Sequence, residues 1–199
     1  MPVIGLTGGI GMGKSASATI LRELGLPVYE ADKAVHVLLR KGGKAVRPVA
    51  RLSPSSLQHG AINRKHLGQL VFGDPGKLRK LEKILHPLVQ QAEAHFLQKA
   101  RKRKAKAAVL EIPLLFETGA DKRCDYVICV MASKAVQRKR VMQRSGMTEK
   151  KLRAIRARQM SDQKKRKLAD FVVNTGNGWK RTRQQLERAL RLILDKNHA

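Results

Sequence analysis

The chain has 199 residues, of which 42% are hydrophobic, and this is enough for one packed core and excludes a disordered chain or a disulfide-stapled miniprotein. Its 42 lysine and arginine residues against 15 acidic residues give a formal net charge of +27, which favours polyanionic partners. Apolar runs of the roughly 18 to 20 residues needed to span a bilayer are absent from the sequence, and the N-terminus does not resemble a signal peptide, so we expect a cytoplasmic protein without membrane contact.

The first predicted elements are a strand and a helix joined by a glycine loop. The apolar run Val3–Thr7 ends at two glycines, as expected of a buried parallel strand. Apolar residues then recur at helical spacing from Ala18 to Leu24, and Gly25 ends the pattern. The sequence therefore predicts a strand, a glycine loop and a helix in that order.

Four further strands are expected along the chain, at 27–29, 108–112, 126–131 and 171–173. Helical patterns separate them, including one at about 32–40 and one near the C-terminus. Alternating strands and helices are typical of a parallel sheet that is covered on both faces. We therefore predict a three-layer α/β fold with a parallel five-stranded sheet.

The expected domain organisation is a single domain, 1–199, with two helical additions. The core comprises about 1–33, 108–133 and 169–199. About seventy residues, 34–107, show helical patterns without a convincing strand and are interpreted as a helical insertion that binds the substrate. The polar helical segment 134–168, here called the lid, carries 14 lysine and arginine residues and is expected to close over the site.

Two cysteines, Cys124 and Cys129, lie without a second Cys/His pair nearby, which argues against a zinc site or a disulfide framework. Two reduced, buried thiols are expected.

The glycine loop carries the strongest motif. Residues 8–15 read GGIGMGKS and satisfy the pattern G-x-x-x-x-G-K-[ST] between a predicted strand and a predicted helix, the setting in which this P-loop binds a nucleoside triphosphate. Backbone N–H groups of the loop and the positive helix end would surround the phosphates. Lys14 would reach the β and γ phosphates, and the Ser15 hydroxyl would be a ligand of Mg²⁺. The nucleotide-binding residues expected in and after this loop are Gly8, Gly9, Gly11, Met12, Gly13, Lys14, Ser15 and Ala16.

A carboxylate follows the second predicted strand. Asp32 comes directly after that strand, at the edge where the P-loop is also expected, and could accept a proton from an acceptor hydroxyl. An alternative is that Asp32 is the N-cap of the helix that follows. Both roles can coexist.

The lid contains two arginines four residues apart. Arg140 and Arg144 would share one face of a helix, where two guanidinium groups could stabilise a transferring phosphoryl group. For each arginine alone, a solvated surface position is the alternative.

Taken in order, these motifs resemble those of the dephospho-CoA kinase family, and the likeness covers nearly the whole chain. The P-loop stretch is followed by Glu30-Ala31-Asp32 and Leu85-His86-Pro87-Leu88. Further along come Ile112-Pro113-Leu114-Leu115-Phe116-Glu117, then Gln137 with the two lid arginines, and finally residues 169–174, ADFVVN.

The resemblance implies a P-loop kinase that transfers the ATP γ-phosphoryl group to the 3′-hydroxyl of dephospho-CoA with Mg²⁺. It implies that Asp32 is the catalytic base, acting with Lys14 and Arg140, and that Arg144 and Asn174 contact the nucleotide. The acceptor substrate would be bound by Asp32, His86, Leu114 and Glu117. A monomer or a small homo-oligomer is expected.

The sequence departs from the family pattern at several positions. Glu111 and Glu30 stand where aspartates are usual, which keeps the charge but adds a methylene to each side chain. Met12 and Ala16 replace frequent hydroxyl residues of the loop. The expected lid arginine near Arg156 is displaced by one position, so Arg156 is left out of the catalytic set.

Two alternatives remain at this point. One is another small-molecule P-loop kinase, acting on a nucleoside monophosphate or a sugar acid. The other is a nucleic-acid-associated NTPase or binding module, favoured by the basic tracts 99–106 and 134–167 but disfavoured by the few, scattered aromatic residues.

Overall fold

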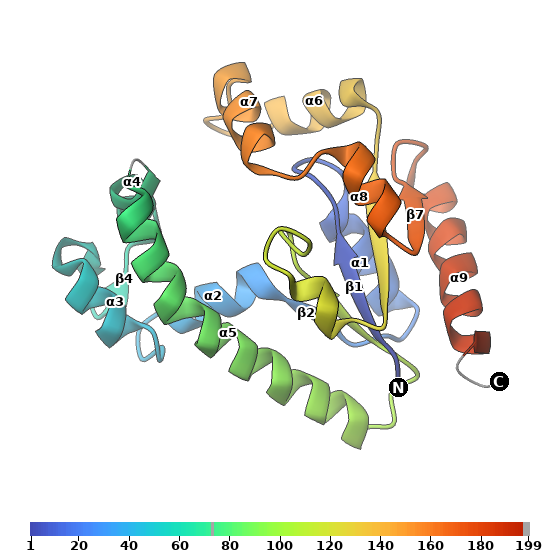
Figure 1. Ribbon diagram of the computed structural model, residues 1–199, viewed down its shortest axis with the longest axis horizontal. Coiled ribbons are helices and arrows are strands. Elements are labelled where there is room, and N and C mark those ends of the chain that lie inside the picture. Colours follow the sequence, from blue (N-terminus) through green and yellow to red (C-terminus); the bar gives the residue numbers. More distant parts are fainter. Residues whose placement is uncertain (73, 197–199) are drawn as a thin grey trace. The chain divides into compact units, whose positions relative to one another are not determined.

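The computed structural model describes residues 1–72 and 74–196. These residues form two compact units (Figure 1). The first unit consists of Met1–Tyr29 and the chain from Lys99 onward, and the second consists of Glu30–Gln98. The expected insertion was 34–107. The second unit starts four residues earlier than this, at Glu30, and its last residue, Gln98, lies nine residues before the expected end. The lid belongs to the first unit.

A five-stranded sheet forms the centre of the first unit. β1 pairs in parallel with β5 and β6, and β6 pairs in parallel with β7. The sheet order is β2-β5-β1-β6-β7. The strands are β1 (Val3–Thr7), β2 (Val28–Glu30), β5 (Ala108–Glu111), β6 (Tyr126–Met131) and β7 (Phe171–Asn174). All five predicted strands are therefore confirmed, with ends that differ by at most one residue.

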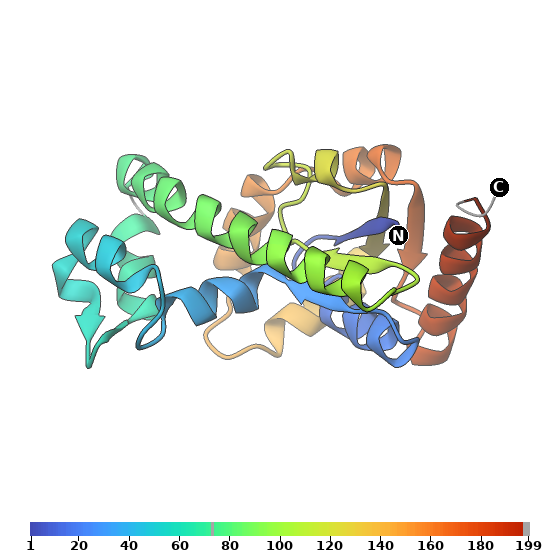
Figure 2. The ribbon, with the colours of Figure 1, turned by 90° about the horizontal axis from the view of Figure 1, so that it is seen from below.

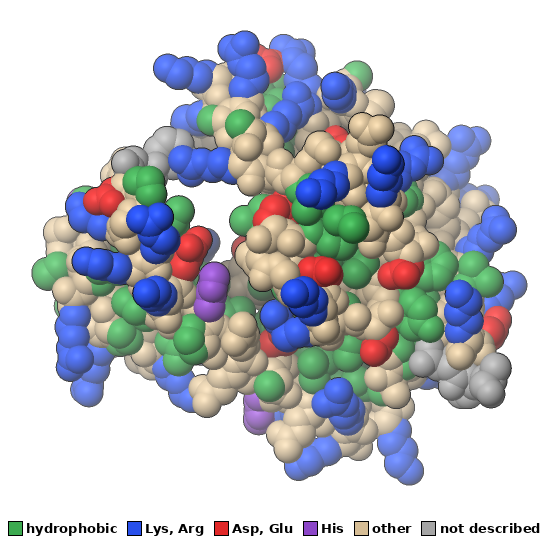
Figure 3. Space-filling view, viewed as in Figure 1, with side chains coloured by type: hydrophobic (Ala, Val, Ile, Leu, Met, Phe, Trp, Pro, Cys, Tyr) green, Lys and Arg blue, Asp and Glu red, His purple; other side chains and the backbone are tan. Residues whose placement is uncertain are grey.

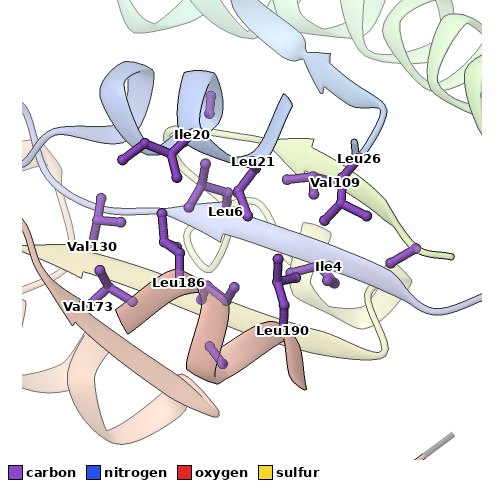
Figure 4. Packing of buried hydrophobic residues seen from close by; sticks show 14 of the residues in the cluster. Ile4, Leu6, Ile20, Leu21, Leu26, Val109, Val130, Val173, Leu186 and Leu190 are labelled. Carbon is purple, nitrogen blue, oxygen red and sulfur yellow. The ribbon is translucent and has the colours of Figure 1, made fainter. Parts of the chain in front are cut away.

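One face of the sheet is covered by two helices, α1 (Lys14–Glu23) and α9 (Trp179–Lys196). Figure 4 shows Leu186 and Leu190 of α9 pointing toward side chains of β1 and α1. Leu186 is fully buried, and burying a leucine side chain contributes about 1.5–3 kcal/mol. These contacts hold α1, and with it the loop before it, against the carboxyl end of β1.

The lid is three short helices rather than one helical segment. They are α6 (Lys134–Met142), α7 (Glu149–Arg158) and α8 (Asp162–Leu168). Each begins at a hydroxyl residue, Ser133, Thr148 or Ser161, whose side chain accepts a hydrogen bond from the backbone N–H three residues further on. Such N-caps satisfy amide groups that a helix leaves free at its first turn, so each cap starts a new helix.

The second unit has a hydrophobic core of its own. Its helices are α2 (Ala31–Leu39), α3 (Val46–Leu52), the short η1 (Pro54–Ser56), α4 (Arg64–Phe72) and α5 (Pro75–Lys102), of which α5 continues into the first unit (Figure 2). The buried residues of this core are Leu38, Leu39, Ala45, Val46, Val49, Ile62, Leu67 and Leu81.

The prediction that residues 34–107 contain no strand is wrong. Two strands of two residues each, β3 (Leu57–Gln58) and β4 (Ala61–Ile62), form an antiparallel hairpin. The two turn residues, His59 and Gly60, have positive φ angles of 48° and 79°, as tight hairpin turns require. Strands this short show no alternating pattern in a sequence.

Both cysteines are free thiols, as expected, but only one of them is buried. Cys129 lies inside β6, where burial raises the pKa of its thiol to about 11. Cys124 follows the short helix η2 (Ala120–Arg123) and is half-buried. In the part of the chain that the structure describes, every helix is too short or too polar to cross a membrane.

Candidate active site

Gly11 and Gly13 are positions in the loop between β1 and α1 where glycine is required. Gly11 and Gly13 have φ angles of 72° and 90°, which other residues rarely adopt. A Cβ atom at Gly11 would lie 2.6 Å from Val141 of α6, and one at Gly13 would lie 2.7 Å from the Thr175 hydroxyl. The P-loop is therefore packed closely against the lid and against the turn that follows β7.

Lys14 is folded back over the P-loop. Its Nζ donates hydrogen bonds to the carbonyl oxygens of Gly8 and Gly9, at 2.7 and 3.4 Å. Lys14 is also the first residue of α1, so the ammonium group lies at the positive end of that helix. An anion placed at the loop would meet both charges.

The other predicted loop residues divide into anchors and exposed positions. The Met12 side chain is buried, its sulfur accepts a hydrogen bond from the Ala132 N–H, and its own N–H donates to the Gly9 carbonyl. Ser15 and Ala16 are exposed in the first turn of α1. Met12 therefore helps to fix the loop, whereas Ser15 and Ala16 are open to solvent.

The two predicted lid arginines lie in different environments. Arg140 is half-buried on α6, and its guanidinium group donates to the Thr175 hydroxyl at 2.8 Å, the Thr175 carbonyl at 2.7 Å and the Gly11 carbonyl at 3.4 Å. The prediction that one helix presents both arginines is wrong, because α6 ends at Met142 and the chain turns there. Arg144 is exposed in that turn.

Two glutamines of the lid bind the backbone of Ile10. Gln137 of α6 donates to the Ile10 carbonyl at 2.7 Å, and Gln159 accepts from the Ile10 N–H at 3.1 Å. Arg156 of α7 donates to the side-chain oxygen of Gln137. These three lid residues line a cavity of about 360 Å³, together with Lys134, Met160, Ser161, Asp162 and Gln163.

Glu117, predicted to bind the acceptor, holds the lid in this structure. Its Oε1 forms an ion pair with Lys165 Nζ and accepts a hydrogen bond from the Met160 N–H, both at 2.8 Å. Burial alone would raise the pKa of Glu117, but the hydrogen bonds from Lys165 and Met160 hold it below its usual range. Lys165 is fully buried, whereas Leu114, three residues before Glu117 in the sequence, is exposed.

Two further residues named from the sequence lie at the ends of strands in the first unit. The Glu111 side chain is buried at the end of β5. Asn174 ends β7, where its side chain accepts from the Gly176 N–H at 2.8 Å and its backbone pairs with Gln185 of α9. Asn174 is exposed and shapes the turn that also contains Thr175.

Asp32 and His86 belong to the second unit, and both are exposed. Asp32 lies in the first turn of α2, two residues after β2 ends. The N-cap interpretation of Asp32 is wrong, because Glu30 occupies that position. His86 lies in the middle of α5 and is followed by Pro87 within the helix.

Basic side chains outnumber acidic ones by 42 to 15 over the whole chain. Figure 3 shows lysine and arginine side chains spread over the visible surface rather than gathered in one patch. Residues 1–72 and 74–196 hold no group of three or more histidine, cysteine or carboxylate side chains that could bind a metal ion by themselves.

The roles of several residues at this site are not predicted by the sequence. Gln159 and Lys165 lie in stretches that look like solvated polar surface. Thr175 lies in the region 174–176, which the family likeness places near the nucleotide base, but its own contacts are not predicted, and Arg156 is left out of the catalytic set. Gln137 was noted only as part of the family likeness. No pattern distinguishes Lys165 from the three cations beside it, because its role depends on a carboxylate 48 residues earlier in the chain.

Comparison with known proteins agrees with this geometry. A family model described as dephospho-CoA kinase matches residues 2–180. A protein named dephospho-CoA kinase from Paramagnetospirillum magneticum is 49% identical over 166 residues, which cover 83% of this chain and 78% of the relative.

Two solved structures resemble the chain over nearly its full length. A crystal structure of a Thermus thermophilus protein has a TM-score of 0.86 at 34% identity and covers 97% of each chain. The dephospho-CoA kinase from Campylobacter jejuni has a TM-score of 0.73 at 30% identity and covers 98% of each chain.

Proposed function

The chain belongs to the dephospho-CoA kinase family, and on that premise we propose how its own residues carry out the reaction. It is a kinase that transfers the γ-phosphoryl group of ATP to the 3′-hydroxyl of dephospho-CoA, the last step of coenzyme A synthesis. The observation that carries the proposal is the glycine loop, with Lys14 at the positive end of α1. Such a loop binds the phosphates of a nucleotide.

The phosphates of ATP would take the place of the loop carbonyls that Lys14 now contacts. The ammonium group of Lys14 needs only to rotate away from Gly8 and Gly9 to meet the β and γ phosphates. P-loop kinases accelerate phosphoryl transfer mainly by positioning the reactants and by neutralising charge. Among the residues of the first unit, Lys14 would therefore make the largest contribution to the rate acceleration.

Arg140 would contribute from a fixed position. Its hydrogen bonds to Thr175 and Gly11 leave part of the guanidinium group unused, and its charge stays beside the loop. A residue held in this way loses little conformational entropy when the nucleotide binds. Arg144, which is exposed beyond α6, would contact the nucleotide only when that turn moves toward it. We also assign the turn at Asn174 to the nucleotide base.

Asp32 would act on the acceptor. Its exposed carboxylate can accept the proton of the 3′-hydroxyl as that oxygen attacks the γ-phosphorus, while the bond from phosphorus to the leaving oxygen of ADP breaks. His86 would bind the same substrate from α5, and the exposed Leu114 would contribute an apolar contact. Glu117 remains a candidate for the acceptor, but its observed contacts favour a role in holding the lid.

Mg²⁺ fits the residues that are present. It keeps several waters and binds through phosphates and one or two protein oxygens, so a site with few carboxylates suits it. Ser15 would supply a direct ligand, and Glu111 would act through water. When bound, the ion would neutralise charge on the transferred phosphoryl group.

The reaction would take place in the cytoplasm. Both cysteines are free thiols, which suits a reducing compartment.

A comparison of acceptors tests the proposal. ADP release from ATP and Mg²⁺ would be followed with dephospho-CoA, shikimate, gluconate and nucleoside monophosphates in parallel, and the product mass would be determined. We expect turnover with dephospho-CoA alone and a product that is one phosphoryl group heavier. Faster turnover with any other acceptor would contradict the assignment.

A further inference from the structure

The lid binds one residue of the P-loop from both sides. Ile10 is a half-buried residue of the loop, and its carbonyl accepts a hydrogen bond from Gln137 while its N–H donates to Gln159. The Ile10 carbonyl needs a donor, so the side-chain NH₂ group of Gln137 faces it. The Ile10 N–H needs an acceptor, so the side-chain oxygen of Gln159 faces it. The two glutamines therefore form a complementary pair around a single residue.

The Gln137 side chain is buried and engaged in hydrogen bonds within the lid and to the P-loop. Only 2% of the residue is exposed, and a buried amide is costly unless its polar atoms are paired. Its nitrogen binds Ile10 and its oxygen accepts from Arg156, so the side chain links α6, α7 and the P-loop.

Gln159 is fixed in a different way. It lies in the short linker between α7 and α8, and the next residue, Met160, donates its N–H to Glu117. Glu117 in turn holds the buried Lys165 of α8. A Cβ atom at Gly9 would also lie 3.4 Å from the Gln159 side-chain oxygen, so the linker packs directly on the loop. Moving this linker would break its contacts to the loop and to Glu117 together.

We propose that Gln137 and Gln159 are positioning residues that hold Ile10, and through it the P-loop, in the shape that receives the phosphates of ATP. The loop then owes its geometry to the lid as well as to its glycines, and the lid and the P-loop act as one element. This inference rests on the proposed binding of ATP phosphates at the loop.

The test uses neutral substitutions of similar size. Gln137→Met and Gln159→Met each remove the hydrogen bond to Ile10 without adding charge, and Gln143→Met at the exposed end of α6 is the matched control. We expect each of the first two variants to raise the KM for ATP about threefold to tenfold, the range for one lost hydrogen bond, with the KM for dephospho-CoA changed less than about twofold. The control should match the unmodified protein.

Gln137 also contacts Arg156, and a double-mutant cycle separates the two contacts. If Gln137 acts through Ile10, adding Gln137→Met to Arg156→Ala should still raise the KM for ATP by about threefold or more. If the double variant is no worse than Arg156→Ala alone, the contact to Ile10 is not what matters and the proposal is wrong.

Amide hydrogen exchange gives a readout that does not depend on activity. In the unmodified, nucleotide-free protein the Ile10 N–H should exchange at least about tenfold more slowly than in an unstructured peptide, and Gln159→Met should remove most of this protection while α9 stays protected. An unprotected Ile10, or equal rises in the KM for both substrates, would overturn the proposal. Lys14→Ala is the reference variant: if it leaves ATP binding intact, the proposed role of the loop fails instead.

Discussion

Lys14 and Arg140, which are assigned to the nucleotide, are held very differently from Asp32 and His86, which are assigned to the acceptor. In the first unit, Lys14 donates hydrogen bonds to the P-loop carbonyls of Gly8 and Gly9, and Arg140 is hydrogen-bonded to Thr175. In the second unit, Asp32 and His86 lie on the exposed surfaces of helices. Lys14 and Arg140 are therefore preorganised, whereas Asp32 and His86 are exposed to solvent.

This difference predicts which substitutions affect stability and ATP binding and which affect turnover and acceptor binding. Changes among the linked residues of the first unit should alter the fold and the binding of ATP together. Changes to the exposed residues of the second unit should alter turnover or acceptor binding and leave stability unchanged, since surface substitutions usually shift it by less than about 0.5 kcal/mol.

The largest effect on activity within the first unit is expected for Lys14→Ala. Removing a charge directed at the transferred group should lower kcat/KM by roughly 10²- to 10³-fold. Steady-state kinetics with ATP and dephospho-CoA measure it, with Lys180→Ala on the exposed side of α9 as the control. A loss below about tenfold would show that the helix end and the loop amides suffice without Lys14.

The buried ion pair of the lid should dominate stability. Glu117→Leu leaves the ammonium group of Lys165 buried without a partner and should cost about 3 kcal/mol of unfolding free energy, measured by urea denaturation. The matched control is Glu149→Leu, which breaks the exposed pair with Arg138 and should cost less than about 1 kcal/mol. Equal losses for the two variants would refute the distinction.

A smaller effect is expected in the second unit. His86→Ala should raise the KM for dephospho-CoA about threefold to tenfold, the range for one lost hydrogen bond, and leave the KM for ATP and the melting temperature unchanged. His95→Ala, on an exposed position of the same helix, should change neither constant. A fall in melting temperature for His86→Ala would instead assign His86 to the packing of its unit.

The smallest effect is a pH dependence. Because the pKa of Glu117 is lowered in the folded protein, its ion pair stabilises the fold above the ordinary glutamate value of 4.5. That contribution is lost as the pH falls below 4.5 and through the lowered value. The unfolding free energy of Glu117→Gln should therefore decline less steeply over this range. Identical pH profiles would contradict the assigned ion pair.

The sheet and the P-loop could be predicted because each depends on neighbours in the sequence. The runs at 3–7 and 126–131 are strands of a parallel sheet. Successive side chains of such a strand point to opposite faces, and because both faces are buried, nearly every residue is apolar. The loop motif is recognisable because its glycines and Lys14 act within eight consecutive residues. Local rules were sufficient in both places.

The lid could not be predicted in the same way. Lys165 is buried because of Glu117, and Gln159 meets Ile10 across 149 positions of the chain. The end of α6 before Arg144 depends on a turn that charge patterns do not indicate. The hairpin β3–β4 was missed because its strands are too short to show a period.

The central claim is that Asp32 serves the chemistry of the acceptor while the first unit binds ATP independently of it. The most direct measurement is the pair of kcat and ATP dissociation constant for Asp32→Asn, an uncharged residue of the same shape. We predict a fall in kcat of roughly 10²- to 10⁴-fold, the contribution of a general base, with an ATP dissociation constant within about twofold of the unmodified protein. Equal losses of turnover and ATP binding, or an unchanged kcat, would contradict this division of roles.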